Sequence, residues 1–375
     1  MHEFPSKFLA LPAPGGSHIK PEIPTLPQMP ANDSRSVVYG NDLNSSDLLL
    51  LGANRSLRGI MVEEYGIGNN FSWEFPTAFS TTSRKVIVDD GDHKYFIKEK
   101  PSYSCTPYKL GISARFQEFL SEETSFVPRI INTKSGSPYL QIGDAYFFTT
   151  DFKEGRMFNG SLQDVKAAGV ALGIMHNHSQ KFEFPGLQKR NATEDVLPFI
   201  DIAEGLKGAD HDRWKEEAIL ALRTTVDKYG GQLDQDVPYV VNHGDYAPFN
   251  LVYDETGVTA LNDFDNVEYR TRVRDLAGAI VSFCDGLSYA GATSTLRRPI
   301  ATSFDPEKAR IFVKGYLEAA PPLSDEEKAD LVGEINVRWS KIMALGIMRG
   351  DFNYHDVLEA LPFQAFVEQN IPAII

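Results

Sequence analysis

The sequence predicts an α+β protein of two lobes, a strand-rich N-terminal lobe followed by a larger helical lobe. Two observations carry this expectation. Runs of β-branched and aromatic residues separated by turn residues fill the chain before residue 151, and amphipathic segments with capping residues dominate after it. At 375 residues the chain exceeds one ordinary domain of about 150 residues, so two lobes around a cleft are expected. We predict a proline-rich arm over 1–45, a first lobe over 46–151 and a second lobe over 152–375.

The first lobe is expected to be mostly sheet plus one packed helix, with a further helix preceding the strands. Asp89-Asp-Gly-Asp is turn chemistry between two strand-like runs and predicts a hairpin. Gly66 is interpreted as the stop of the first helix. In chain order the predicted elements are a helix over 46–65, strands over 85–88 and 94–98, a helix over 106–123, and strands over 127–132 and 139–150.

The second lobe is expected to be mainly helical because capping residues precede its long amphipathic runs. Ser161 is a candidate N-cap, Asp305 precedes a proline at the first helical position, and Ser324-Asp-Glu-Glu has capping-box spacing. The predicted helices run from Ser161 to about 176, over 212–229, from Asp305 onward, and from Ser324 to about 348.

The composition excludes several classes of function. A formal net charge of −14 argues against a nucleic-acid partner and favours cationic ligands. No apolar run approaches the roughly 20 residues of a membrane span. The two cysteines, Cys105 and Cys284, form no metal or disulfide pattern, so we expect a cytoplasmic protein.

Two short apolar strands, 240–242 and 258–261, end in polar clusters that suit phosphate chemistry. Asn250 and Asp263 offer the hard oxygen ligands that Mg²⁺ prefers. Asp245 would then be free to face the hydroxyl group of an acceptor. A residue that follows a strand projects from a rigid support, which favours a catalytic role.

His243-Gly-Asp-Tyr-Ala-Pro-Phe-Asn250 resembles the catalytic loop of the aminoglycoside phosphotransferase and choline kinase family, and Asp263-Phe resembles its metal-binding aspartate. The resemblance implies a protein-kinase-like fold, ATP and Mg²⁺ as cofactors, and a small-molecule hydroxyl as acceptor. It implies that Asp245 is the catalytic base, that His243 braces the loop, and that Asn250 and Asp263 hold Mg²⁺. Asp275, in a later Asp-Leu-Ala segment, is expected to be structural or simply a helix N-cap.

The nucleotide-binding residues that the resemblance implies lie in the first lobe. Lys98 ends the second strand of the hairpin and would pair with phosphate, with Lys100 as the alternative. Glu118 is predicted to face away from the apolar side of its helix, so the acidic partner of Lys98 stays unassigned. Thr149 and Asp151 lie in the segment expected to join the lobes and hold adenine. The predicted phosphate-covering loop is Ser80, Thr81, Thr82 and Ser83.

These features predict a small-molecule kinase that phosphorylates a hydroxyl of an antibiotic, amino alcohol, amino sugar or hydroxy amino acid. The alternatives are a protein kinase of the same fold and a non-catalytic kinase-like binding protein. The first is disfavoured because His-Gly-Asp replaces His-Arg-Asp, and the second because no magnesium or base residue is lost. His176 and His178 are interpreted as structural residues rather than metal ligands. From the net charge the acceptor is expected to be cationic, and the sequence leaves the oligomeric state open.

Overall fold

The computed structural model describes residues 57–68, 70–74, 85–102, 105–190, 192, 194, 196–205, 213–230, 233, 237–284, 304–349 and 363–375. The predicted N-terminal arm over 1–45 and the predicted phosphate loop at Ser80–Ser83 lie outside these residues. The chain divides into two compact units. Unit 1 holds the described residues up to Pro107 together with Ile130–Phe152, and unit 2 holds Tyr108–Arg129 and Lys153–Ile375.

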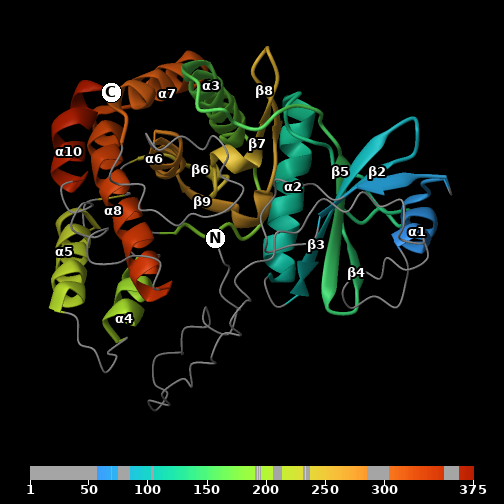
Figure 1. The fold of residues 1–375 in the computed structure, drawn as a ribbon, viewed down its shortest axis with the longest axis horizontal. Coiled ribbons are helices and arrows are strands. Elements are labelled where there is room, and N and C mark those ends of the chain that lie inside the picture. The colour runs from blue at the N-terminus through green and yellow to red at the C-terminus, as the bar shows by residue number, and fades with distance from the viewer. Residues whose placement is uncertain are drawn as a thin grey trace. The chain divides into compact units, whose positions relative to one another are not determined.

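Unit 1 is built on a five-stranded antiparallel sheet in the order β1-β2-β3-β5-β4 (Figure 1). The predicted hairpin is confirmed: β2 and β3 pair from Asp89↔Lys94 to Lys85↔Lys98. The carboxylates of its turn accept backbone N–H groups, from Gly91 to Asp89 and from His93 to Asp90. The strands are β1 (Ser72–Glu74), β2 (Lys85–Asp89), β3 (Lys94–Pro101), β4 (Leu140–Ile142) and β5 (Ala145–Asp151).

A short helix, α1 (Leu57–Ile60), continues as a π-helical turn over Met61–Tyr65 in unit 1. Gly66 ends this helix with φ 75° and donates its backbone N–H to the carbonyl of Met61, so the predicted stop is confirmed. The core of the unit joins the helix to the sheet and contains Ile60, Met61, Ile67, Phe71, Val86, Val88, Ile97, Ala145 and Phe147.

Two strand predictions for this part of the chain are wrong in detail. Residues 127–132 form only an isolated bridge between Ile130 and Thr150. Pro128 cannot donate a backbone hydrogen bond, which disfavours a continuous strand there. The segment 139–150 is divided into β4 and β5 by a turn in which Gly143 has φ 55°.

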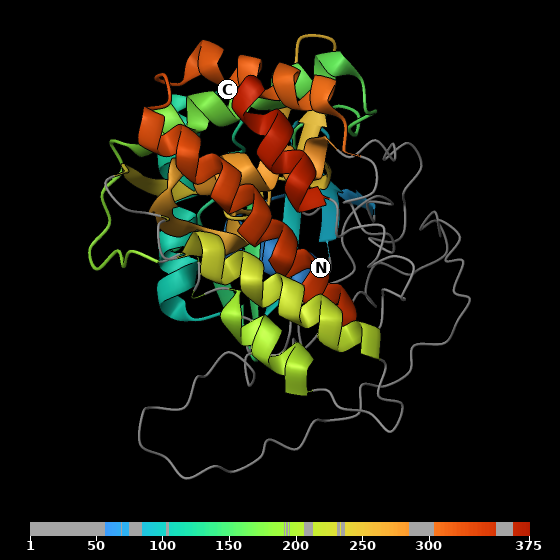
Figure 2. The same cartoon turned by 90° about the vertical axis from the view of Figure 1, so that its left-hand side faces the viewer.

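Unit 2 is mainly helical and carries two small antiparallel ribbons, β6–β9 and β7–β8. The long helix α8 packs against α4, α5 and α6 (Figure 2). The helices are α2 (Pro107–Glu123), α3 (Leu162–Ser179), α4 (Leu197–Gly205), α5 (Arg213–Gly230), α6 (Arg272–Phe283), α7 (Pro306–Ala319), α8 (Asp325–Arg349) and α10 (Phe363–Asn370). The strands are β6 (Tyr239–Asn242), β7 (Leu251–Tyr253), β8 (Val258–Leu261) and β9 (Glu268–Thr271).

Three predicted helix starts in this unit are confirmed by their hydrogen bonds. The Ser161 hydroxyl accepts from the backbone N–H of Asp164. Asp305 accepts from the backbone of Glu307 and Lys308. The box at the start of α8 is reciprocal, since Glu327 N donates to Ser324 Oγ and Ser324 N donates to Glu327 Oε2.

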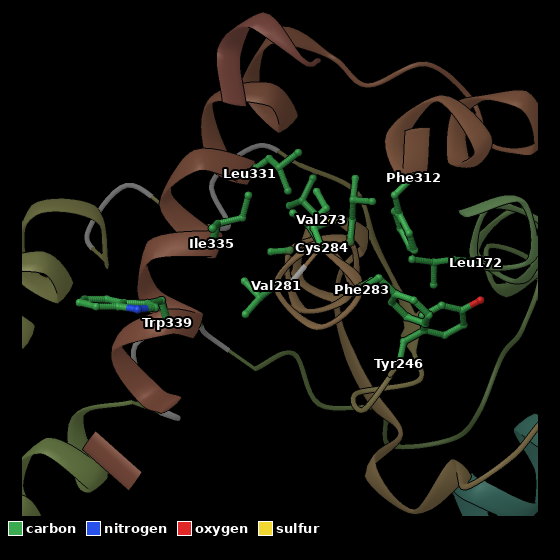
Figure 3. Packing of buried hydrophobic residues seen from close by; sticks show 14 of the residues in the cluster. Leu172, Tyr246, Val273, Val281, Phe283, Cys284, Phe312, Leu331, Ile335 and Trp339 are labelled. Atoms are coloured by element: carbon green, nitrogen blue, oxygen red, sulfur yellow. The ribbon is translucent and has the colours of Figure 1, made fainter. Parts of the chain in front are cut away.

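One hydrophobic core joins the helices of unit 2 (Figure 3). Leu172 of α3, Phe283 of α6 and Phe312 of α7 are fully or almost fully buried within it. Tyr246, from the loop after β6, points into the same cluster and packs against Phe283. The loop is thereby anchored to the helical core. Among the described residues, no helix is long and apolar enough to cross a membrane.

Candidate active site

The candidate active site is built around the loop His243–Ala247, which follows β6 and leads through a 3-10 turn (Pro248–Asn250) into β7. Gly244 has φ 79°, a conformation that other residues rarely adopt. A Cβ atom added there would also overlap the backbone oxygen of Asn266. The glycine therefore lets this loop approach the turn that follows β8.

His243 ties the loop to that same turn. Its Nε2 lies 2.9 Å from the carbonyl oxygen of Asn262, and its Nδ1 lies 3.3 Å from the backbone nitrogen of Asp245. Because Asp245 N–H needs an acceptor, Nδ1 carries no proton and Nε2–H donates to Asn262. The ring also packs on Phe264 at 4.9 Å between centroids. These contacts are those of a bracing residue.

Asp275 fixes the loop from α6. Its Oδ2 accepts the backbone N–H of His243 at 2.6 Å, and its Oδ1 accepts that of Gly244 at 2.9 Å. The N-cap interpretation is wrong, because Thr271 occupies the cap position and Asp275 lies within the first turn of the helix. The carboxylate bonds across 31 and 32 positions of sequence, which local spacing cannot reveal.

A buried network continues from Asp275 through α3 to α7. His176 Nε2 lies 3.4 Å from Asp275 Oδ2, and its Nδ1 lies 3.1 Å from the Tyr316 hydroxyl. Burial lowers the pKa of His176. Burial raises the pKa of Asp275, but the hydrogen bonds from His176 and from the loop backbone outweigh it and leave that pKa below its usual value. The pair is therefore a neutral imidazole and an ionised carboxylate, with Tyr316 donating to Nδ1. His178 instead pairs with Glu123 at 2.8 Å.

We expect Asp275→Asn to lower the free energy of unfolding by about 2–4 kcal/mol, because an amide can accept only one of the two backbone N–H groups and turns its own donor toward the other. Urea unfolding followed by circular dichroism measures this. Asp227→Asn, at an exposed position on α5, is the matched control and should change little. Equal stabilities of the Asp275 variant and the control would contradict the anchoring role.

Asp245 lies in this braced loop beside Asn250. The Asn250 amide nitrogen donates to the backbone oxygen of Asp245 at 2.8 Å and reaches its Oδ2 at 3.5 Å. Burial raises the pKa of Asp245, an effect that the positive charge of Arg338 opposes. The residue that follows, Tyr246, donates its hydroxyl to the carbonyl of Ala168 in α3 at 2.8 Å. The loop is thus held on both sides of the aspartate.

Asn250 and Asp263 are brought together by the β7–β8 ribbon. Asn250 immediately precedes β7, and its backbone oxygen accepts from Asn262 N at 2.8 Å just after β8. Asp263 follows in the left-handed region with φ 69°, the only described non-glycine residue with positive φ. Such a conformation costs energy, so it is an expected feature of a functional position.

The donor set fits a magnesium ion. The side-chain nitrogen of Asn250 donates to the backbone oxygen of Asp245, so the side-chain oxygen of Asn250 faces in another direction. Asp263 contributes a carboxylate. Within the described ranges, no group of three or more His, Cys, Asp or Glu side chains could hold a metal ion. Two hard oxygen donors are what Mg²⁺ usually takes from a protein when phosphates and water complete its octahedron.

The expected nucleotide residues lie on the sheet of unit 1. Lys98 is half-buried in β3 opposite Phe148 of β5, and Lys100 on the same strand is buried. Thr149 is completely buried, whereas Asp151 is partly exposed at the end of β5. The chain passes from unit 1 to unit 2 directly after Phe152. The roles of Lys98, Thr149 and Asp151 stay predictions.

Glu118 lies on α2 with its side chain 26% exposed and 4.0 Å from Arg115, one turn earlier. Ile112 and Phe116 of the same helix are buried, as the apolar pattern predicts. The acidic partner of Lys98 stays unassigned.

Sequence reasoning did not anticipate the contributions of Tyr246 and Arg338. Tyr246 stands inside the recognised loop, where an aromatic residue next to the aspartate could have signalled a packing anchor. Arg338 belongs to α8, far from the loop in sequence, and only the packing of α8 on α6 brings its charge to Asp245.

Comparison with known proteins identifies the family of the chain. The family model of the phosphotransferase enzyme family matches residues 79–312, more than half of the chain and a range that includes the loop, Asn250 and Asp263. No curated protein sequence matches the chain significantly.

Solved structures share the fold at low sequence identity. A microcompartment-associated aminopropanol kinase has a TM-score of 0.60 at 16% identity, covering 84% of this chain and 97% of its own. An amicoumacin kinase in complex with AMP-PNP and Ca²⁺ has a TM-score of 0.61 at 15% identity, covering 83% and 92%. A Plasmodium vivax ethanolamine kinase has a TM-score of 0.52 at 11% identity, covering 85% and 89%. These likenesses confirm the predicted α+β, protein-kinase-like fold. The match to the family model shows that the chain belongs to the phosphotransferase enzyme family.

Proposed function

We propose that this phosphotransferase moves the γ-phosphate of ATP to a hydroxyl group of a small, amine-bearing molecule. The observation that carries the proposal is the arrangement of Asp245, Asn250 and Asp263, an aspartate beside two oxygen donors on one braced loop and ribbon. The same combination serves kinase chemistry, in which one aspartate orients the acceptor and two oxygen ligands hold the metal.

The residues divide the chemistry among them. Asp245 accepts the hydrogen bond of the acceptor hydroxyl and takes its proton as that oxygen bonds to the γ-phosphorus, while the bond from the γ-phosphorus to the bridging oxygen breaks and ADP leaves. His243 and Asp275 hold the loop so that this carboxylate keeps one orientation. Asn250 and Asp263 hold Mg²⁺, which when bound neutralises charge on the phosphates. Lys98 is proposed to pair with phosphate, and the segment that includes Thr149 and Asp151 is proposed to hold adenine.

An amine on the acceptor is supported by two lines of argument. The formal charge of −14 favours cationic ligands over anionic ones. Proteins of similar fold include kinases named for aminopropanol and ethanolamine, both amino alcohols. Neither Cys105 nor Cys284 forms a disulfide, which supports a reducing compartment such as the cytoplasm as the proposed location.

The test is an ADP-release assay with ATP and Mg²⁺ across amino alcohols, hydroxy amino acids, amino sugars and aminoglycosides. We expect at least one amine-bearing alcohol to stimulate ADP release well above the acceptor-free rate. The matched controls are the same amines without the hydroxyl, which should not stimulate it. Absence of stimulation by every hydroxyl acceptor would contradict the proposed function, and preference for a neutral or anionic alcohol would contradict the amine.

A further inference from the structure

We infer that Arg338 binds a carboxylate of the acceptor, so that the acceptor is a zwitterionic hydroxy amino acid rather than a simple amino alcohol. This inference rests on the proposed function and names the substrate class of that same site. Three observations support it: the position of Arg338, its positive charge, and the pairing of the neighbouring arginines with glutamates.

Arg338 lies where α8 packs on α6. A Cβ atom added at Gly278 would lie 3.8 Å from the Nε atom of Arg338 and 4.0 Å from its Cζ atom. The guanidinium therefore rests over Gly278, where the missing side chain leaves room for it. Gly278 is three residues after Asp275 and so shares its helix face. That face is the one that holds the catalytic loop through His243 and Gly244.

The charge of Arg338 reaches Asp245. Of the carboxylates that act on Arg338, Asp245 has the largest effect, ahead of Glu268 and Asp275. Since Arg338 rests on the helix face that anchors the loop of Asp245, we infer that one small acceptor presents its hydroxyl to Asp245 and a second polar group to the guanidinium.

The neighbouring arginines are paired with glutamates, whereas Arg338 has no such partner among the described residues. Arg272 forms two hydrogen bonds with Glu327, at 2.6 and 2.7 Å, and Arg274 pairs with Glu334 at 3.1 Å. In the part of the chain that the structure describes, Arg338 makes no hydrogen bond or ion pair. Its side chain is nevertheless partly buried, and burial lowers its pKa. A partly desolvated guanidinium without a hydrogen-bonded anion is costly, so the site favours an anionic ligand.

The carboxylates whose charges act on Arg338 already have other partners or roles. Asp275 accepts two backbone N–H groups and contacts His176. Glu268 lies 3.1 Å from the Nε atom of Arg270 and 3.7 Å from Arg190. Asp245 is the proposed base. Since none of these described carboxylates is hydrogen-bonded to Arg338, we infer that the anion of the site comes with the ligand.

A carboxylate suits this position chemically. The planar guanidinium presents parallel N–H donors that match the two oxygens of a carboxylate, and it stays charged at all physiological pH values. Together with the amine proposed above, this defines an acceptor with a hydroxyl, an ammonium and a carboxylate.

The experiment compares acceptors that differ only in the carboxylate: serine with ethanolamine, and homoserine with 3-aminopropan-1-ol. We expect the wild-type protein to have the higher kcat/KM for the carboxylate-bearing member of at least one pair. Arg338→Gln should lower that value by about 10- to 100-fold, chiefly through KM, since a charged hydrogen-bonded pair is lost. The value for the amino alcohol should change by less than about threefold.

Two further variants sharpen the comparison. Arg310→Gln removes an equal charge from an exposed position on α7 and should change neither member of a pair. Arg338→Lys keeps the positive charge but lacks the parallel N–H donors of the guanidinium, so it should recover part of the lost kcat/KM. Thermal unfolding of each variant shows whether the fold is retained.

The outcomes separate the inference from the proposed function. A wild-type preference for acceptors without a carboxylate, or transfer confined to them, overturns the inference while the kinase stands. An equal loss of kcat for both members in Arg338→Gln also overturns it, because Arg338 would then act on the loop or the transferred group. Failure of every hydroxyl acceptor to stimulate ADP release overturns the proposed function itself.

Discussion

Replacing Asp245 with alanine is expected to lower turnover by about 10²- to 10⁴-fold while leaving ATP affinity nearly unchanged. The carboxylate acts on the acceptor hydroxyl, mainly in the transition state, whereas nucleotide binding is proposed to use other residues. Because His243, Asp275 and Tyr246 hold the loop without the Asp245 side chain, the variant should keep its fold. Steady-state kinetics with a nucleotide titration by calorimetry measure both quantities.

The matched control for this variant is Glu255→Gln, which removes a carboxylate from an exposed position in the β7–β8 turn. It should retain wild-type turnover. If Asp245→Ala kept more than about a tenth of wild-type turnover, Asp245 would be rejected as the base. A large loss of ATP affinity would instead place the aspartate among the nucleotide-binding residues.

The second large effect is expected for Asp263→Asn. An amide keeps the shape of the side chain but loses the charge that a hard divalent cation needs, so activity should be abolished at ordinary magnesium concentrations. Raised Mg²⁺ should restore part of the rate, because the oxygen donor is weakened and not removed. A magnesium titration of kcat for wild type and variant measures the shift.

Asp265, two residues later in the 3-10 turn, is the natural comparison. Asp265→Asn should show the magnesium dependence of the wild type. If Asp263→Asn required no more magnesium than the wild type does, Asp263 would not be the ligand and Asp265 would take its place. Loss of activity in both variants with one shared shift would indicate that the turn as a whole is needed.

The local parts of the fold could be predicted because their causes are local. The β2–β3 hairpin follows from Asp89 and Asp90, whose side chains bond to the turn backbone. The starts of α3, α7 and α8 follow from capping residues within three positions of each helix. The prediction of a strand over 127–132 was wrong because Pro128 cannot donate a backbone hydrogen bond. The helix α4 was missed because it is short and carries Pro198 near its start.

The candidate site likewise has a local part that the sequence predicts and a long-range part that it does not. Fixed spacing between His243, Asp245 and Asn250 identified the loop. By contrast, the loop is held by a network of residues on helices elsewhere in the sequence. Asp275, His176 and Tyr316 meet only in the folded chain, since His176 bonds to the other two across 99 and 140 residues.

The acceptor illustrates the limit of composition. A net charge of −14 describes the whole chain and predicts attraction of a cation. It does not predict the position of Arg338, whose positive charge acts on Asp245. At physiological salt the Debye length is about 8 Å, so a charge at the site outweighs distant charges. An acceptor with both an ammonium and a carboxylate satisfies the two observations together.

The most direct test of the central claim is ³¹P NMR of the reaction mixture with ATP, Mg²⁺ and the best acceptor of the panel. The account predicts that the wild-type protein converts the γ-phosphate signal into that of a phosphate monoester on the acceptor hydroxyl, and that Asp245→Ala does not do so on the same timescale. A phosphoramidate signal, inorganic phosphate alone, or an equal ester signal from both proteins would contradict it.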